Sequence, residues 1–487
     1  MCDRCSNPKG EIVMKRILTF ILALLALVAL IGMDLSETGT TAVIVQAESA
    51  EIAAAAVQNQ GGEVYEVLSI INAVSAEINQ NKLAALEADE RVISVFEDAE
   101  VSATGRRPRQ RNAPTVNFPQ VMGVDEVWDA GITGDSVTVA LIDSGISRLP
   151  WTRGRIVADY DALDDGPRRR DGYGHGTMMA GLIGNSRQDR NGYVGIAPAV
   201  NFVDVRALDR EGRGEYSDII ESLDWILTNK DTYDIQVVNL SLVSGINSPY
   251  WADPLNMAVE ALWDAGVVVV AAAGNLGPDP LTIAAPGNDP YIITVGAFTD
   301  NYTPEDESDD YVAPFSSAGP TETGFVKPDV IAPGAHMITQ GWPVSTWARE
   351  HRENRVRGLY YETAGTSSAA AVTSGVVALM LDANPDMTPD QVKFALMRSA
   401  RPATYEDGSL AWSIFQQGAG RVEAETAVLA PPEGEANTGM TIGEPYVGPV
   451  VYRDNEFVIV DENGNPIADA SGYVWAGGYV WAGGYVW

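Results

Sequence analysis

The feature that most constrains the fold is a series of short apolar runs that begins at residue 137. Their sequences are VTVALI (137–142), NFVDV (201–205), IQVVNL (235–240), VVVVAA (267–272) and YIITVG (291–296). Runs of this length without regular polar alternation suit strands that are buried on both faces. The stretches between them carry the helical pattern, near 217–228, 254–265, 367–382 and 389–400. We therefore predict an α/β fold, a doubly wound and mostly parallel sheet with helices on both faces.

A second, smaller unit precedes this domain. Residues 42–101 alternate between strand-like and helical patterns, which predicts a compact α+β module. Residues 102–117 follow with four arginines and two prolines but no apolar period, so we predict an exposed linker that is easily cut. The larger domain then extends over 118–430.

The two ends of the chain have distinct compositions. Residues 15–31 are a basic pair followed by an apolar run of signal-peptide length, so 1–35 is predicted to be a signal peptide, with Met14 as the favoured start. A retained signal anchor is the alternative, because no clean cleavage motif follows. The segment 431–487 ends in GYVWAG repeats, for which an adhesive or β-forming tail and a poorly ordered low-complexity end are both open.

Charge and cysteine content exclude several classes of function. Asp and Glu number 66 against 32 Lys and Arg, a formal charge of −34, which argues against binding to nucleic acid or to anionic membranes. An exported, soluble protein fits this balance. The two cysteines, Cys2 and Cys5, precede Met14, so we expect no disulfide in the mature protein.

Functional groups in an open parallel sheet gather beyond the carboxyl ends of the strands. Asp143 follows VTVALI at such an end, although a turn or capping role explains it equally well by itself. The chain has three histidines. His351 lies in a charged stretch, and His336 lies in a loop without distinctive neighbours. His175, by contrast, lies between two glycines in GHGTMMAG. Imidazole is the side chain whose pKa suits it to deprotonate a serine near neutral pH, so His175 is the candidate base.

Ser367 lies before the apolar helix AAAVTSGVVALML, at a helix start that favours developing negative charge. The alternative is that Thr366 or Ser367 only caps this helix. Asn275 ends the run VVVVAAAGN, where it is either a turn residue or an amide donor to the same site. These signals all occur at strand ends or helix starts of one sheet, which makes them much stronger together than apart.

The order Asp143, His175, Ser367, within VALIDSGI, GHGTMMAG and GTSSAAA, resembles the subtilisin-like serine peptidases, or subtilases. The likeness covers roughly residues 118–425, and further matching pieces recur in register: VGIAP (194–198), VVNLSL (237–242), AAAGN (271–275), ITVGA (293–297), FSSAGP (315–320) and KPDVIAPG (327–334). Residues 42–101 similarly resemble the inhibitory propeptide of secreted subtilases, which implies a ferredoxin-like fold.

This resemblance implies roles for individual residues. Ser367 would be the nucleophile, His175 the general base and then acid, and Asp143 the group that holds the histidine tautomer. Asn275 and the Ser367 backbone N–H would form the oxyanion hole. The predicted substrate-binding residues, from two strand ends, are Ser241, Leu242, Val243, Ala273 and Gly274.

Three features depart from the family pattern. Ser368 and Ala371 replace the usual Met and Pro after the nucleophile, which concerns the geometry of the helix. Val243 replaces a glycine of the substrate strand, so a narrower cleft is expected. Residues 341–358 look like an insertion close enough to line the rim of the cleft.

No cofactor is required for this chemistry. Subtilases commonly bind structural calcium, and the loop 186–195 offers Asp189, Asn191 and backbone carbonyls as oxygen ligands, although a plain surface turn explains the loop as well.

We therefore predict a secreted serine endopeptidase made as a zymogen, acting on protein or peptide substrates and inhibited by its own propeptide. An association with the cell surface through the tail is left open. The alternative is a catalytically silent scaffold that binds peptides or surfaces.

Overall fold

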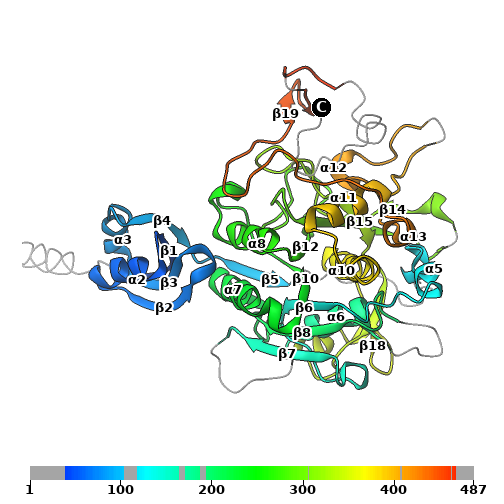
Figure 1. The fold of residues 1–487 in the computed structure, drawn as a ribbon, viewed down its shortest axis with the longest axis horizontal. Helices are drawn as coiled ribbons and strands as arrows, with labels where there is room; N and C mark the ends of the chain where they lie inside the picture. Colours follow the sequence, from blue (N-terminus) through cyan, green and yellow to red (C-terminus); the bar gives the residue numbers. More distant parts are fainter. Residues whose placement is uncertain are drawn as a thin grey trace, which may run out of the picture.

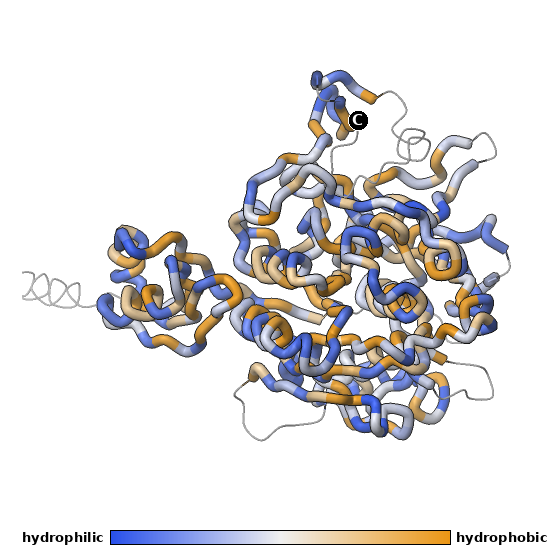
Figure 2. Tube along the Cα trace, in the orientation of Figure 1, coloured by the Kyte–Doolittle hydropathy of each residue, from blue (hydrophilic) through white to orange (hydrophobic). Residues whose placement is uncertain are grey.

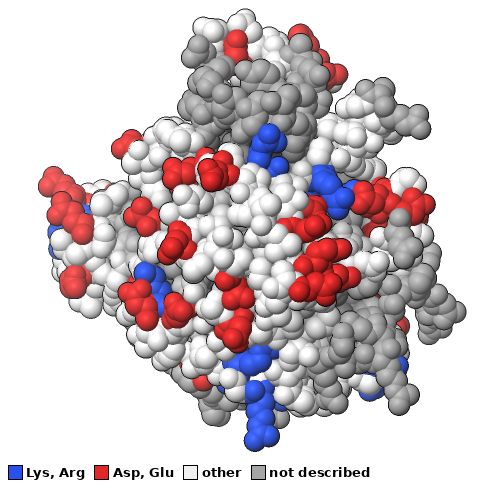
Figure 3. Space-filling view, turned by 45° about the vertical axis from the view of Figure 1, so that its right-hand side comes forward, with Lys and Arg blue, Asp and Glu red and all other residues white. Residues whose placement is uncertain are grey.

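The computed structural model describes residues 39–103, 118–163, 171–186, 194–304, 306–405, 408–461 and 463–467. A small N-terminal lobe lies beside a large domain, and strand β5 leads from one into the other (Figure 1). On the face drawn in Figure 3, acidic side chains are widely spread and basic ones lie in small groups, as the net charge of −34 leads one to expect.

The large domain is built on a sheet with the strand order β14-β13-β12-β10-β6-β8-β7, in which β15 also pairs with β13. Its pairings are parallel except for β13 with β14. This confirms the predicted doubly wound, mostly parallel sheet. The strands are β6 (Thr138–Asp143), β7 (Ile156–Asp161), β8 (Asn201–Arg206), β10 (Ile235–Leu240), β12 (Val268–Ala272), β13 (Ile293–Thr299), β14 (Tyr311–Val312) and β15 (Val330–Pro333).

Helices cover both faces of this sheet. In Figure 1, α7 and α8 lie on one side of the central strands, and α6 and α10 on the other. The main helices are α6 (His175–Gly184), α7 (Tyr216–Tyr233), α8 (Pro254–Asp264), α10 (Thr366–Ala383) and α11 (Pro389–Ser399). Smaller helices are α4 (Phe118–Val121), α5 (Val124–Asp129), α12 (Ile414–Gln417) and α13 (Ala424–Leu429).

Helix α10 is the central helix of the core. It contacts α6 and strands β10, β12, β13 and β15, and almost all of its side chains are buried, as is typical of a helix that is apolar on every side. In the described part of the chain it is the one helix long and apolar enough for a membrane span, but 89% of that window is buried inside the protein. Hydrophobic residues gather around it in Figure 2.

The small lobe has the βαββαβ order of a ferredoxin-like unit. Its antiparallel sheet has the order β2-β3-β1-β4 and its helices are α2 and α3. The elements are β1 (Thr40–Ala47), α2 (Ala50–Asn59), β2 (Glu63–Leu68), β3 (Ala73–Asn79), α3 (Gln80–Glu87) and β4 (Val92–Glu97). Ile44, Leu68, Ile71 and Ala73 belong to the main core of the large domain, so one sheet face is buried against α7 and α8.

The chain leaves this lobe as strand β5 (Glu100–Ala103), which is the middle strand of a three-stranded antiparallel sheet. Its neighbours are β11 (Leu242–Val243) and β9 (Arg213–Glu215). Ser102 and Ala103, which the composition assigned to the linker, are therefore strand residues. The rest of the predicted linker, 104–117, lies outside the described residues.

Residues 341–358, the predicted insertion, form regular secondary structure. They contain α9 (Thr346–Glu350) and β17 (Arg355–Arg357), and β17 joins β16 (Met337–Gln340) and β18 (Tyr360–Thr363) in an antiparallel sheet. Trp347 of α9 is buried and packs edge-on against Tyr361.

The C-terminal extension adds a hairpin, β19 (Val450–Arg453) and β20 (Glu456–Ile459), which agrees with the strand-like pattern there. Val450 and Ile459 share a small apolar core with Val326 and Ile414 of the large domain. The GYVWAG repeats lie outside the described residues, as does the predicted signal peptide.

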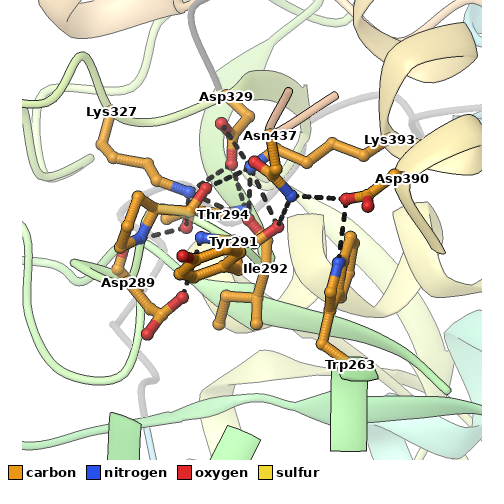
Figure 4. A network of polar contacts seen from close by, with 12 residues as sticks. Trp263, Asp289, Tyr291, Ile292, Thr294, Lys327, Asp329, Asp390, Lys393 and Asn437 are labelled. Atoms are coloured by element: carbon orange, nitrogen blue, oxygen red, sulfur yellow. Dashed lines mark hydrogen bonds and ion pairs between the residues drawn. The ribbon is translucent and has the colours of Figure 1, made fainter. Parts of the chain in front are cut away.

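A buried charge network connects α11 to the edge of the sheet (Figure 4). Lys327 Nζ donates to Asp329 Oδ2 at 2.6 Å and to the Ile292 carbonyl at 2.9 Å. Lys393 Nζ donates to the carbonyls of Pro290 and Ile292, and lies 3.4 Å from Asp329 Oδ1. One buried carboxylate thus faces two buried ammonium groups, and burial lowers the pKa of Lys393 to about 7.

Asp329→Asn is expected to lower the free energy of unfolding by about 3–5 kcal/mol at pH 6, because it leaves two buried cations without their anion. The difference in the free energy of unfolding between the parent and Asp329→Asn should become smaller toward pH 9. A lysine with a lowered pKa in the folded state binds fewer protons there than when unfolded, so its deprotonation makes the fold more stable as pH rises. Urea unfolding at both pH values, in a Ser367→Ala background to prevent self-digestion, measures this. Asp279→Asn, at an exposed position, is the control, and equal stability of the two variants would contradict the expectation.

Candidate active site

Asp143 and His175 are brought together where β6 ends and α6 begins. Asp143 is the last residue of β6 and His175 the first of α6, and both are buried. The Nδ1 atom of His175 lies 2.8 Å from Asp143 Oδ2 and 3.0 Å from Oδ1. The Ser144 backbone N–H donates to Oδ1 at 2.7 Å, which fixes the carboxylate.

Gly176 is required for this approach. A Cβ at this position would lie 2.3 Å from the Gly145 carbonyl oxygen and 3.1 Å from the Asp143 Cβ, so any other residue would push α6 away from the end of β6. The close approach of α6 to the end of β6 therefore explains why a glycine follows the histidine, which the sequence alone did not explain.

A second carboxylate, Asp171, organises the histidine loop. Its Oδ1 accepts from the Gly174 N–H at 2.5 Å and from Ser144 Oγ at 2.8 Å. Its Oδ2 accepts from the Thr177 N–H at 2.9 Å and hydroxyl at 2.6 Å. Burial raises the pKa of Asp171 to about 6 despite these bonds. Sequence analysis missed this residue, and its only signal is an aspartate four positions before His175.

The segment 341–358 contacts the same loop. The N–H groups of Thr346 and Trp347, at the start of α9, donate to the carbonyls of Gly172 at 3.0 Å and Tyr173 at 2.9 Å. The insertion is therefore attached directly ahead of His175, next to the predicted cleft.

Ser367 is the second residue of α10 and is fully buried. Gly365, which has no side chain, is the N-cap of this helix, so the alternative that Thr366 or Ser367 acts as the cap is wrong. Ser241 Oγ donates to the Ser367 carbonyl at 2.9 Å, and α10 packs against α6, which carries His175.

Asn275 is held at the same helix start. Its Oδ1 accepts from the Thr366 N–H at 3.0 Å and from the Thr366 hydroxyl at 3.1 Å. The Gly274 N–H donates to Thr366 Oγ1 at 3.1 Å. Because Oδ1 is engaged by Thr366, the amide Nδ2 is directed to the other side as a donor. Thr366 is a second residue that sequence analysis considered only as a cap.

Strand β5 lies between β11 and β9, next to Gly274 and Asn275, and we call the place that it occupies the groove. Leu242 pairs with Ala103 and Val243 with Ser102, while the Ala103 N–H donates to the Gly212 carbonyl at 3.0 Å. Val243 therefore does not prevent an extended strand from pairing here. A pocket of about 590 Å³ opens beside the strand, and its wall includes Gly274, Asn275, Val243, Leu276, Leu281, Ile246 and Ile283.

The other two histidines have settings of their own. His336 was expected to lie in a loop without special surroundings, but its Nδ1 is hydrogen-bonded to the Tyr302 hydroxyl and lies 3.1 Å from Glu362 Oε1. The ring of His351 packs on Trp347 at a centroid distance of 4.7 Å. Asp143 is thus paired with the histidine that the sequence favoured.

The family model for subtilases matches residues 134–420, more than half of the chain. The chain belongs to the subtilase family. It is accordingly a serine endopeptidase, as its curated relatives indicate. Serine protease AprX of Bacillus subtilis (strain 168) is 36% identical over 373 residues, covering 74% of this chain and 79% of that protein.

Other subtilases give the same result. An extracellular serine proteinase of Thermus sp. (strain Rt41A) is 33% identical over 70% of this chain and 74% of its own length. Among solved structures, fervidolysin from Fervidobacterium pennivorans, a keratinolytic enzyme related to subtilisin, superposes with a TM-score of 0.65 over 89% of this chain and 69% of its own. Its 20% identity supports the fold alone.

The departures from the subtilase pattern can now be placed. Ser368 and Ala371 are buried within α10, which runs without interruption from Thr366 to Ala383. Asp189 and Asn191, the predicted calcium ligands, lie outside the described residues. Where the chain is described, no three Asp, Glu, His or Cys side chains are grouped as a metal site would require.

Proposed function

We propose that this subtilase is a secreted endopeptidase, made as a zymogen, whose catalytic triad is Asp143, His175 and Ser367. The observation that carries the proposal is the Asp143–His175 hydrogen bond, beside a helix start whose contacts hold Ser367 and Asn275. The full set of predicted substrate-binding residues, Ser241, Leu242, Val243, Ala273 and Gly274, belongs to the same proposal.

Each group then has one task. Since Asp143 holds Nδ1, the opposite nitrogen, Nε2, takes the Ser367 proton as Oγ attacks the substrate carbonyl carbon. The proton passes to the leaving amine, and water hydrolyses the acyl-enzyme by the reverse sequence of proton transfers. Asp143 keeps the imidazole oriented and stabilises the imidazolium that forms.

The oxyanion would be bound by Asn275 Nδ2 and the Ser367 N–H. Thr366 holds the amide by its oxygen before substrate arrives, so the donor requires no reorganisation during the reaction. Helix starts present N–H donors, and the helix dipole adds a partial positive charge at the start of α10.

Substrate would bind as an extended strand. β5 exemplifies this mode, because it forms main-chain hydrogen bonds to both β11 and β9. We further propose that residues 39–103 are the inhibitory propeptide, with β5 blocking the groove. Its direction supports this role, because it runs from Val243 toward Leu242 and hence toward Ser241, which contacts Ser367.

The apolar wall of the pocket beside Asn275 indicates a preference for substrates with a large apolar residue immediately before the cleaved bond. Leu276 and Leu281 are 74% and 55% exposed, so they present apolar surface that such a side chain would cover. Digestion of a peptide library, read by mass spectrometry, is expected to show Leu, Phe, Met or Tyr at this position. A predominance of Lys or Asp would contradict it.

The competing scaffold hypothesis is tested in the same preparation. A fluorophosphonate probe should label Ser367 in the processed protein, because an activated serine reacts with it whereas an ordinary one does not. Absence of label from processed, folded protein would support a catalytically silent scaffold instead.

A further inference from the structure

The boundary between the small lobe and α7 is lined by acidic side chains. Two of these carboxylates cap backbone groups across the boundary. Asp98 accepts from the N–H of Ser217 at 2.8 Å, and Asp224 accepts from the N–H of Ser69 at 3.2 Å. A third carboxylate, that of Glu66 in the small lobe, faces Glu221 of α7.

A β-bulge directs Glu66 toward α7. Val64 pairs with Ala76, whereas Glu66 pairs with Ser75, so the register between β2 and β3 shifts at Tyr65. Val64 packs against the core of the small lobe, while Leu68, two residues after Glu66, belongs to the core of the large domain. Bulges re-aim side chains in this way.

Strand β2 packs against α7, and Glu66 and Glu221 face each other across this contact. The Tyr160 hydroxyl donates to Glu221 Oε1. The Oε2 atoms of Glu66 and Glu221 are both buried, and neither accepts a hydrogen bond from the described residues. No Lys or Arg in the described part of the chain forms an ion pair with either group. Two buried carboxylates that face each other without a cation cannot both be ionised at little cost, so the pair retains one proton.

We propose that Glu66 and Glu221 form a proton-dependent latch, in which one shared proton holds the small lobe on the large domain and its loss releases the lobe from the groove as pH rises. This regulation rests on the proposed inhibitory role of residues 39–103. No covalent bond is made or broken, and the proton passes to solvent.

The direction follows from linkage. Burial, followed by the facing Glu221, raises the pKa of Glu66 to about 8. In the separated lobe this group returns to the ordinary glutamate value of about 4.3. The docked form therefore binds more protons between these values, so docking is strongest at low pH. It weakens by up to about tenfold per pH unit as pH rises toward 8.

The other groups at the boundary act in the same direction or not at all. Burial also raises the pKa of Asp98, Asp218 and Asp224, so each favours docking at low pH. The pKa of Tyr160 is raised too, which keeps it a donor throughout this range. The exposed Arg213–Glu100 pair, 4.0 Å apart, contributes little.

The test is amide hydrogen exchange of the full chain carrying Ser367→Ala, at half-unit steps from pH 5 to 9. The reporters are the N–H of Ser69, bound to Asp224, and that of Tyr216, bound to the Ala99 carbonyl at 2.8 Å. Strands β6 and β10 serve as internal references, and rates are corrected for the intrinsic pH dependence of exchange.

In the parent, protection of the reporters is expected to fall by up to about tenfold per pH unit between pH 6 and 8, while the references stay unchanged. Glu66→Gln and, independently, Glu221→Gln should reduce this slope to the part contributed by Asp98, Asp218 and Asp224, because an amide donates to the remaining carboxylate at every pH. Glu63→Gln, an exposed position on the same strand, should keep it.

A flat profile in the parent overturns the latch without reference to any variant, and so does an unchanged slope in both glutamine variants. The measurement needs no catalysis. Failure of the protease proposal would instead appear as absent fluorophosphonate labelling and would leave these exchange rates unaffected.

Discussion

Replacing Ser367 with alanine is expected to lower kcat for a peptide with an apolar residue before the cleaved bond by about 10⁶-fold, the loss known for the nucleophile of a subtilisin. His175 then has no hydroxyl to deprotonate, and the acyl-enzyme route is lost. The residual rate reflects binding and the oxyanion hole alone. Steady-state kinetics measure the effect, after the linker of both proteins has been cut by an added arginine-specific protease that is then inhibited.

Ser368→Ala is the matched control, because Ser368 is the next residue of α10 and is equally buried. It should retain kcat within about tenfold. If Ser368→Ala lost activity and Ser367→Ala kept it, the nucleophile would be assigned to the wrong serine.

The same Ser367→Ala change also tests self-processing. Produced in a host free of other proteases, the wild-type protein should acquire a new N-terminus between about residues 103 and 117, whereas the variant should keep its small lobe attached. N-terminal sequencing distinguishes the two. Processing of the variant would show that another protease cuts the arginine-rich linker.

Asp143→Asn is expected to lower kcat by about 10⁴-fold. An asparagine amide that donates to Nδ1 forces the imidazole into the tautomer with its proton on Nε2, which cannot accept the serine proton. KM should change little, because Asp143 is buried behind the histidine and does not line the groove.

Asp135→Asn, an exposed aspartate ahead of the other end of β6, is the control and should leave both constants unchanged. A higher KM with an unaltered kcat for Asp143→Asn would indicate that Asp143 shapes the groove and does not orient the histidine. Circular dichroism of the variant checks that β6 and α6 remain folded.

The sheet could be predicted from the sequence because its strands are buried on both faces, which leaves local runs such as VTVALI and IQVVNL. The pairing of Asp143 with His175 was implied by the resemblance to subtilases, because the local pattern alone explained Asp143 equally well as a turn or capping residue. Strand β3 was missed, because AVSAEIN mixes small and polar residues. Strand β5 was missed because EVSA gains its partners from segments more than a hundred residues away.

Residues that act through long-range hydrogen bonds could also not be predicted from the sequence. Asp171 matters because Ser144 and Thr177 surround it, and Thr366 because Asn275 lies beside it. Nothing in the local pattern of either residue records these neighbours. The burial of Trp347 could not be predicted either, because many of its near neighbours in the sequence are charged.

With β5 in the proposed inhibitory role, its position between two strands has a consequence for which proteins this enzyme would digest. Once β5 departs, β9 and β11 face each other with their inner N–H and C=O groups unpaired, and only a flat stretch of chain can satisfy both borders at once. A helix or a tight turn does not fit such a slot. Vulnerability of a target is therefore governed less by its composition than by how readily a few consecutive residues can be pulled straight, which favours loosened or denatured proteins over compact ones.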